Sequence, residues 1–259
     1  MPMPTYDDEL VVLRSQPLGE ADRIVTCIGK ESGHVRAVAR GVRRTSSKIG
    51  ARLEPFNVVD AQLFARATGN NRGLETVTQA VMVHPFSARI RERYLTYAAA
   101  NVIAEVADTV VPAEPAPLQY ALIVAALRDL SADRHAVELT TCAYVLRSLA
   151  LAGWEPTFTE CARCGEPGPH PFVSVALGGA ICQACAASAG ALLRTDVDTL
   201  RLCWALLVGN WRVADASESP AREATVRIVA AYAAYHLERP LRSFGLFDQI
   251  RRADPKGEQ

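Results

Sequence analysis

Long apolar runs are the first feature that this sequence lacks. Stretches such as Ala121–Leu127 are far shorter than the ~18 consecutive apolar residues that a membrane-spanning helix needs. The segment Met1–Glu9 has neither the basic start nor the apolar stretch of a secretory signal peptide. Together these features predict a cytoplasmic protein.

Aromatic residues are also scarce, at 7% of the chain, and only Tyr6, Phe56 and Phe64 lie within the first 80 residues. A strong binder of single-stranded nucleic acid stacks bases on several aromatic side chains. The spacing of Phe56 and Phe64 favours positions in a hydrophobic core instead. Nucleic-acid binding by this region should therefore be mostly electrostatic and indifferent to base sequence.

The sequence contains no Gly-rich phosphate-binding loop of the G-x-x-x-x-G-K-[ST] type and no metal-ligand set that leaves a coordination position open. These absences argue against nucleotide hydrolysis and against metal-assisted catalysis. The chain also has no net charge, because 28 basic residues balance 28 acidic ones. The distribution of the charge is therefore more informative than its sum.

Cysteine, by contrast, is present in a pattern. Four of the seven cysteines form two close pairs, Cys161 with Cys164 and Cys182 with Cys185, and 17 residues separate the pairs. Each pair can direct two sulfurs at one ion from a short turn, so that two pairs complete a closed tetrahedron without a position for water. The sequence therefore predicts one structural zinc ion, held by these cysteines in a Pro- and Gly-rich module at about residues 153–194.

Other interpretations of the cysteines are weaker. A thiol redox enzyme would use a single C-x-x-C motif, but it needs a β-α-β setting that the Pro- and Gly-rich flanks do not offer. A disulfide framework is disfavoured because Cys27, Cys142 and Cys203 are isolated, lie in apolar surroundings and make the total odd. We expect these three cysteines to be core residues.

The pattern of apolar residues changes near residue 85. The segments before it alternate between apolar and polar residues and predict five strands of a small barrel, at Glu9–Leu13, Arg23–Ile28, His34–Arg40, Val58–Phe64 and Leu74–Val83. The segments after it predict helices at Ser87–Ala107, Leu118–Leu130, Arg134–Ala152, Asp196–Trp211 and Ala221–Arg239. We therefore predict a multi-domain α+β protein, with a barrel domain at 1–84 and a helical domain at 85–259 that contains the zinc module as an insertion.

Positive charge concentrates between Lys30 and Arg52, where seven basic residues face one acidic residue and give a net charge of +6. Cations concentrated beside a strand and a loop can release counterions from a phosphate backbone. Period-two geometry places His34, Arg36, Val38 and Arg40 on one face of the third strand. The candidate phosphate contacts are Arg36, Arg40, Arg43, Arg44, Lys48 and Arg52. The simpler alternative is that these are the solvated charges of an ordinary surface loop.

Several segments together resemble a known family. Leu13–Val25 (LRSQPLGEADRIV), Gly33–Arg44 (GHVRAVARGVRR), Ser47–Gly50 (SKIG) and Leu53–Phe56 (LEPF) are similar, in order and spacing, to the N-terminal domain of the bacterial DNA repair and recombination mediator family RecO. The cysteine quartet stands where that family carries its zinc module. His236–Ser243 (HLERPLRS) resembles the end of the family's C-terminal helix.

The resemblance implies an oligonucleotide/oligosaccharide-binding (OB) barrel followed by a helical domain with the zinc site. Such proteins bind single- and double-stranded DNA and anneal complementary strands. With the partner RecR they place the RecA recombinase on DNA coated by single-strand-binding protein, whose acidic, apolar C-terminal tail is expected to recruit them. They are not enzymes, so no catalytic residue is expected, and a location at the bacterial nucleoid follows.

A zinc-ribbon transcriptional regulator is the alternative from another class. It would also need basic residues and a cysteine quartet, but it should read base edges from a basic recognition helix. The nearest approach to such a helix is the segment Ile90–Tyr94. The metal content of the purified protein separates the redox alternative from the zinc-binding ones.

Overall fold

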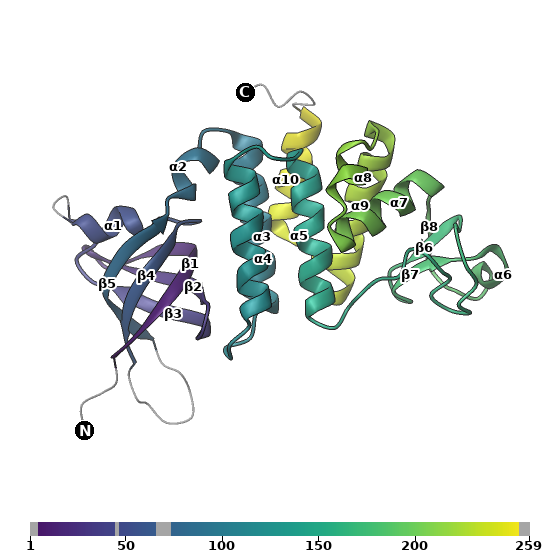
Figure 1. The fold of residues 1–259 in the computed structure, drawn as a ribbon. Helices are drawn as coiled ribbons and strands as arrows, with labels where there is room; N and C mark the ends of the chain where they lie inside the picture. Colours follow the sequence, from purple (N-terminus) through teal and green to yellow (C-terminus); the bar gives the residue numbers. More distant parts are fainter. Residues whose placement is uncertain (1–4, 45–46, 66–73, 254–259) are drawn as a thin grey trace. The chain divides into compact units, whose positions relative to one another are not determined.

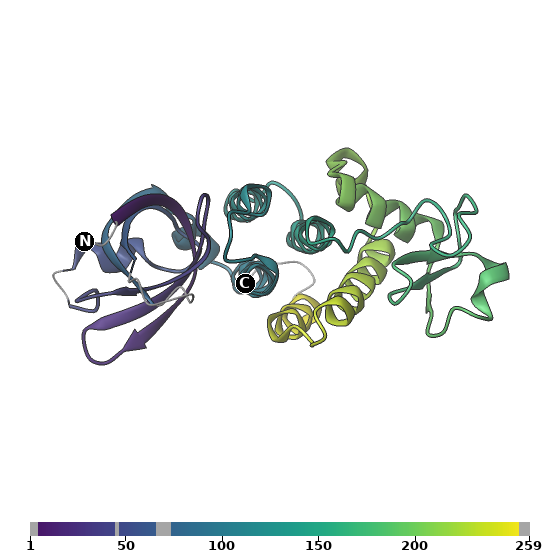
Figure 2. The same cartoon turned by 90° about the horizontal axis from the view of Figure 1, so that it is seen from below.

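The computed structural model describes residues 5–44, 47–65 and 74–253. The chain forms two compact units, Met1–Ala132 and Asp133–Gln259. The first unit contains a five-stranded barrel and the helices α1 to α4, and the second contains the helices α5 to α10 and a small three-stranded sheet (Figure 1 and Figure 2). In the described part of the chain, no helix combines the length and the apolar character that crossing a membrane requires.

The strands of the first unit close into a barrel (Figure 2). They are β1 (Thr5–Leu18), β2 (Asp22–Gly29), β3 (Gly33–Ala39), β4 (Val58–Phe64) and β5 (Glu75–His84). Their order around the barrel is β1-β2-β3-β5-β4, and β4 pairs with β1 to close it. The β3–β5 pair is parallel and the other pairs are antiparallel. A closed five-stranded barrel with one crossover is the architecture of the OB fold, so the predicted fold class is confirmed.

The barrel forms because its strands alternate between apolar and polar residues. On β3 the side chains of Val35, Ala37 and Ala39 are buried, whereas Arg36 is exposed. Each strand contributes such an apolar row to one shared core, in which Cys27 is fully buried as predicted. The alternation leaves the other row of β3 to face outward.

The connection between β3 and β4 contains a short helix that was not predicted, α1 (Lys48–Arg52). The Ser47 hydroxyl accepts a hydrogen bond from the amide of Gly50 at 3.3 Å and so caps its first turn. Leu53, directly after the helix, is fully buried in the barrel core. The basic segment Lys30–Arg52, called the basic tract below, is therefore fixed to the barrel at its C-terminal end.

Three helices complete the first unit, namely α2 (Phe86–Ile90), α3 (Tyr94–Val110) and α4 (Pro117–Ser131). The predicted single helix Ser87–Ala107 is wrong, because Arg91 caps α2 and Arg93 is extended, at φ −129° and ψ 132°. Strands give way to helices between β5 and α2, at the predicted position. The packing contacts, however, place α2, α3 and α4 in the same compact unit as the barrel.

In the second unit α5 (Val137–Leu151), α7 (Val197–Val208) and α9 (Ser219–His236) pack on one another. Cys142 of α5 and Cys203 of α7 are buried, as predicted. The predicted helix Asp196–Trp211 ends early, because Gly209 adopts a left-handed conformation at φ 75° and a separate helix, α8 (Trp211–Asp215), follows.

A further helix, α10 (Arg242–Ala253), was not predicted. Its Arg251 pairs with Glu223 of α9 and, at 2.6 Å, with Asp248 of its own helix. The hydrogen bond from Arg251 lowers the pKa of Glu223 and outweighs the opposing effect of burial. The pair with Glu223 therefore holds α10 against α9.

The segment between α5 and α7 contains β6 (Phe172–Ser174), β7 (Gly179–Ile181), the short helix α6 (Gln183–Ala186) and β8 (Leu193–Arg194). The strands form a sheet in the order β7-β6-β8. None of these short elements was predicted individually, although the segment coincides with the predicted module at about residues 153–194.

Candidate metal centre and nucleic-acid interface

The first cysteine pair lies in a loop that backbone hydrogen bonds close. The amide of Cys161 donates to the carbonyl of Glu166, and the amide of Gly165 donates to the carbonyl of Cys161, each at 2.8 Å. Gly165 has a φ of 75°, which glycine adopts without steric cost. The buried His170 supports the loop, since its Nε2 donates to the carbonyl of Glu166 at 2.8 Å.

The second pair lies directly after β7. Cys182 precedes α6, and the amide of Cys185 within α6 donates back to the carbonyl of Cys182 at 3.2 Å. A backbone hydrogen bond of 2.8 Å from Ala162 to Ala180 joins the loop of the first pair to the strand that leads into the second. The two pairs are thus brought together by backbone contacts outside the cysteines themselves.

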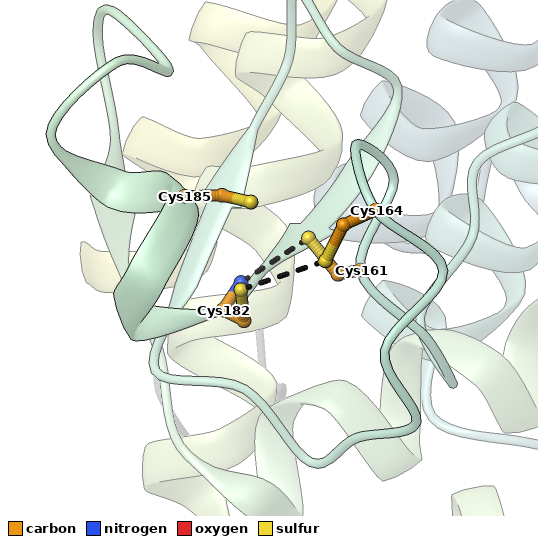
Figure 3. A group of neighbouring side chains, drawn as sticks. All are labelled: Cys161, Cys164, Cys182 and Cys185. Atoms are coloured by element: carbon orange, nitrogen blue, oxygen red, sulfur yellow. Dashed lines mark hydrogen bonds between the residues drawn. The ribbon is translucent and has the colours of Figure 1, made fainter.

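The four cysteine side chains converge on one point (Figure 3). All four sulfurs lie within 4.8 Å of one another, and the sulfurs of Cys164 and Cys182 are 3.8 Å apart. Zinc–sulfur bonds of about 2.3 Å in a tetrahedron separate the sulfurs by about 3.8 Å, so the cluster has the dimensions of a four-thiolate site. These four cysteines could therefore hold a metal ion.

The sulfurs lie in one small buried cluster of the module. This cluster consists of Cys161, Ile181, Cys182 and Ala189, and a few partly buried apolar side chains pack against them. Phe158, Val173 and Ala180 are also buried in the module. Two of the four buried members are thus candidate ligands themselves. A metal ion held by all four cysteines would join this cluster to both loops.

Electrostatics around the sulfurs favour a bound cation. Burial raises the pKa of the Cys161 thiol, but hydrogen bonds from the backbone amides of Cys182, Cys164 and Arg163 outweigh burial and lower the pKa to about 6. Contact with the thiols of Cys182 and Cys164 raises the pKa of Cys185 to about 12. Four sulfurs this close cannot all ionise without a compensating positive charge, which a divalent cation supplies.

Three of the predicted phosphate contacts are exposed and available. Arg36 points outward from β3, and Arg40 and Arg44 lie in the turn that follows. Within the described residues, none of these three side chains has a hydrogen-bond or ion-pair partner. We call these three exposed side chains, on β3 and the turn after it, the arginine row.

The other predicted contacts differ in their surroundings. Arg43 is exposed, and its Nη1 donates to the carbonyl of Gly19 at 2.8 Å. Arg52 is half-buried, and its Nη1 donates to the carbonyl of Ala80 on β5 at 2.7 Å. The side chain of Lys48 lies outside the part of the molecule that the structure describes. The structure thus holds Arg43 and Arg52 against the barrel.

His34 shares a face of β3 with Arg36, but it faces α3 rather than solvent. Its Nε2 lies 2.8 Å from Oδ1 of Asp108, whose Oδ2 accepts from Arg14. The outward face of β3 is therefore covered near its start. Sequence spacing could not reveal this pairing, because Asp108 lies 74 positions after His34.

Comparisons with known proteins are consistent with this arrangement. Residues 3–86 match the family model described as "Recombination protein O N terminal", and residues 91–244 match "Recombination protein O C terminal". A "DNA repair protein RecO" of Cutibacterium acnes is 44% identical over 95% of this chain and 100% of its own length. The Streptomyces griseus protein of the same description is 46% identical over 93% of this chain and 98% of its own length.

Proposed function

Because the chain belongs to the RecO family of DNA repair proteins, we propose that it is a non-enzymatic mediator of recombinational repair. It binds single- and double-stranded DNA and anneals complementary strands. With RecR it helps to load RecA onto DNA coated by single-strand-binding protein, in the cytoplasm at the nucleoid. The observation that carries this proposal is the arginine row, Arg36, Arg40 and Arg44, on the outside of an OB barrel.

The annealing mechanism follows from the charge of DNA. Two complementary strands repel each other because each carries a dense line of phosphates. Exposed arginines that neutralise some of these phosphates reduce the repulsion, and they contact no base edge in doing so. Pairing then proceeds on its own free energy, without nucleotide hydrolysis and without a catalytic side chain.

The cysteine quartet has a structural role in this proposal. Cys161, Cys164, Cys182 and Cys185 hold one zinc ion, which fits the sulfur spacing and the small core of the module. Bound zinc supplies a fixed crosslink between the two loops and no reaction chemistry. The helical domain receives the acidic, apolar tail of single-strand-binding protein, as the family resemblance implies.

The alternatives receive less support. A zinc-ribbon regulator would insert a basic helix into the major groove. The candidate segment Ile90–Tyr94 does not form one, because α2 ends at Ile90 and α3 begins only at Tyr94. A thiol redox enzyme would use one cysteine pair, whereas the structure brings both pairs to a single point.

Annealing provides the test of the proposed function. Purified protein mixed with bare complementary strands should accelerate their pairing without ATP. The acceleration should fade as salt rises through a few tenths molar, because salt competes for the phosphates. Dependence of annealing on ATP, measured by fluorescence quenching between labelled strands, would overturn the assignment.

A further inference from the structure

A cavity of about 530 Å³ lies in the first unit, beside the end of the basic tract. One wall comes from the segment after α1, with Glu54 and Phe56, and the other from α2 and the start of α3. Two tyrosines, Tyr94 and Tyr97, line the second wall. They fall after residue 90, so the scarcity of aromatics in the barrel sequence gave no indication of them.

Both tyrosines present aromatic surface to solvent. Tyr94 is 78% exposed and Tyr97 is 43% exposed. They are three positions apart in the first turn of α3, which places them on one face of the helix. The rings of Phe56 and Tyr97 make an edge-to-face contact, with their centroids 5.7 Å apart and their planes at 77°. Tyr97 is thus held in position, while Tyr94 projects into solvent.

The walls of the cavity are rigidly joined. The buried side chain of Asn57 donates to the carbonyls of Ala51 and Arg52 in α1, both at 3.3 Å, and accepts from the amide of Ser87 in α2 at 3.0 Å. Phe56 keeps a left-handed backbone at φ 75°, which is unfavourable for an aromatic residue and persists only where the surrounding structure holds it. The cavity is therefore formed before any ligand binds.

The charged groups of the cavity are mixed in sign. Glu54 pairs with Arg23 at 2.8 Å and with Arg91 at 3.6 Å, and Glu92 pairs with Arg89 at 3.1 Å. The carboxylates can accept hydrogen bonds from the N–H groups of a base, and Arg91, the arginine that lines the cavity, can contact the adjoining phosphate. An acidic peptide would bring several carboxylates beside Glu54 and Glu92, whereas one nucleotide brings a single phosphate and a base with N–H donors. The charges therefore favour a nucleotide over an acidic peptide.

We propose that this cavity binds an unstacked base of single-stranded DNA, with the base stacked on Tyr94 or Tyr97 and its edge facing Glu54. The inference rests on the proposed function, because it assumes that the barrel carries DNA. Glu54 follows Arg52 by two positions, so the cavity begins where the basic tract ends in the sequence. The cavity has room for one or two bases, so most bases of a bound strand stay free to pair. Bases inside a duplex are unavailable, so the site discriminates in favour of single strands.

Tyr94→Ala should weaken binding of a short single strand of mixed sequence on the order of tenfold, since stacking of one base on an aromatic ring has about this effect. Binding of an abasic strand of the same length, and of duplex DNA, should not change, because neither offers a free base. Tyr94→Phe keeps the ring and should restore the affinity. Tyr235→Ala removes a tyrosine that is also exposed but lies in the second unit, and it is the matched control.

Equal losses on the intact and abasic strands, or no loss on either, would overturn the proposal. Loss of binding to an acidic, apolar peptide without loss of single-strand binding would assign the cavity to a protein partner and would also overturn it. Failure of the wild-type protein to bind any DNA would instead contradict the proposed function. The exposed position of Tyr94 means that folding should be unaffected, and circular dichroism checks this.

Discussion

Cys164→Ser is expected to abolish stoichiometric zinc binding and to unfold the module at about residues 153–194, while the barrel keeps its structure. The buried cluster around the sulfurs is small, and two of its four buried residues are cysteines of the quartet. Structural zinc supplies an apparent binding free energy of roughly 10 to 16 kcal/mol in small modules. The three thiolates that remain in the variant would bind zinc more weakly and supply only part of this free energy. Elemental analysis and hydrogen exchange resolved along the chain measure both effects.

Cys142→Ala is the matched control, because Cys142 is buried in α5 outside the quartet. It should retain one zinc per chain and lose only modest stability. If wild-type protein purified without chelator lacks stoichiometric zinc, the four-cysteine zinc site is contradicted. If the thiols of this zinc-free protein are oxidised reversibly and a dithiol reductant restores them, the redox alternative gains support.

Simultaneous replacement of Arg36, Arg40 and Arg44 by alanine is expected to flatten the salt dependence of DNA binding. If about five of the six predicted residues each neutralise one phosphate, log affinity falls with log salt at a slope of roughly −3.5 on single strands. Removal of three contacts should reduce the magnitude of this slope by about 2. Titrations at several salt concentrations measure it, and the loss should be similar for different base sequences.

The matched control replaces the same three arginines by lysine. Because the slope counts neutralised phosphates, the lysine variant should keep it even if its affinity falls. All three side chains are exposed, so neither variant should affect folding. An alanine variant with unchanged affinity and slope would place the DNA contacts elsewhere on the protein.

Local patterns in the sequence predicted the barrel correctly, and they singled out four cysteines that the structure brings close together. Strand periodicity depends on neighbouring residues, and β3 buries Val35, Ala37 and Ala39 as its alternation requires. The spacing within each cysteine pair is likewise local, and the two pairs could bind one ion only by coming together. Both features follow from chemistry that the sequence displays directly.

Long-range contacts explain what the sequence did not show. The break between α2 and α3 has no proline or glycine to mark it, and it accompanies the hydrogen bond from Ser87 to Asn57, 30 positions earlier. The pairing of His34 with Asp108 and the placement of Tyr97 against Phe56 depend on the same folding of α3 onto the barrel. Helix α10 was missed because its segment is strongly polar overall and one of its three buried residues is Arg251.

Annealing of complementary strands that are precoated with single-strand-binding protein is the decisive measurement of mediator activity. Without ATP, the wild-type protein should pair the coated strands, and the alanine variant of Arg36, Arg40 and Arg44 should pair them far more slowly. The lysine variant should retain most of the activity. Coated strands that stay unpaired with the wild-type protein, or that pair equally fast with the alanine variant, would contradict a mediator that acts through the arginine row of its barrel.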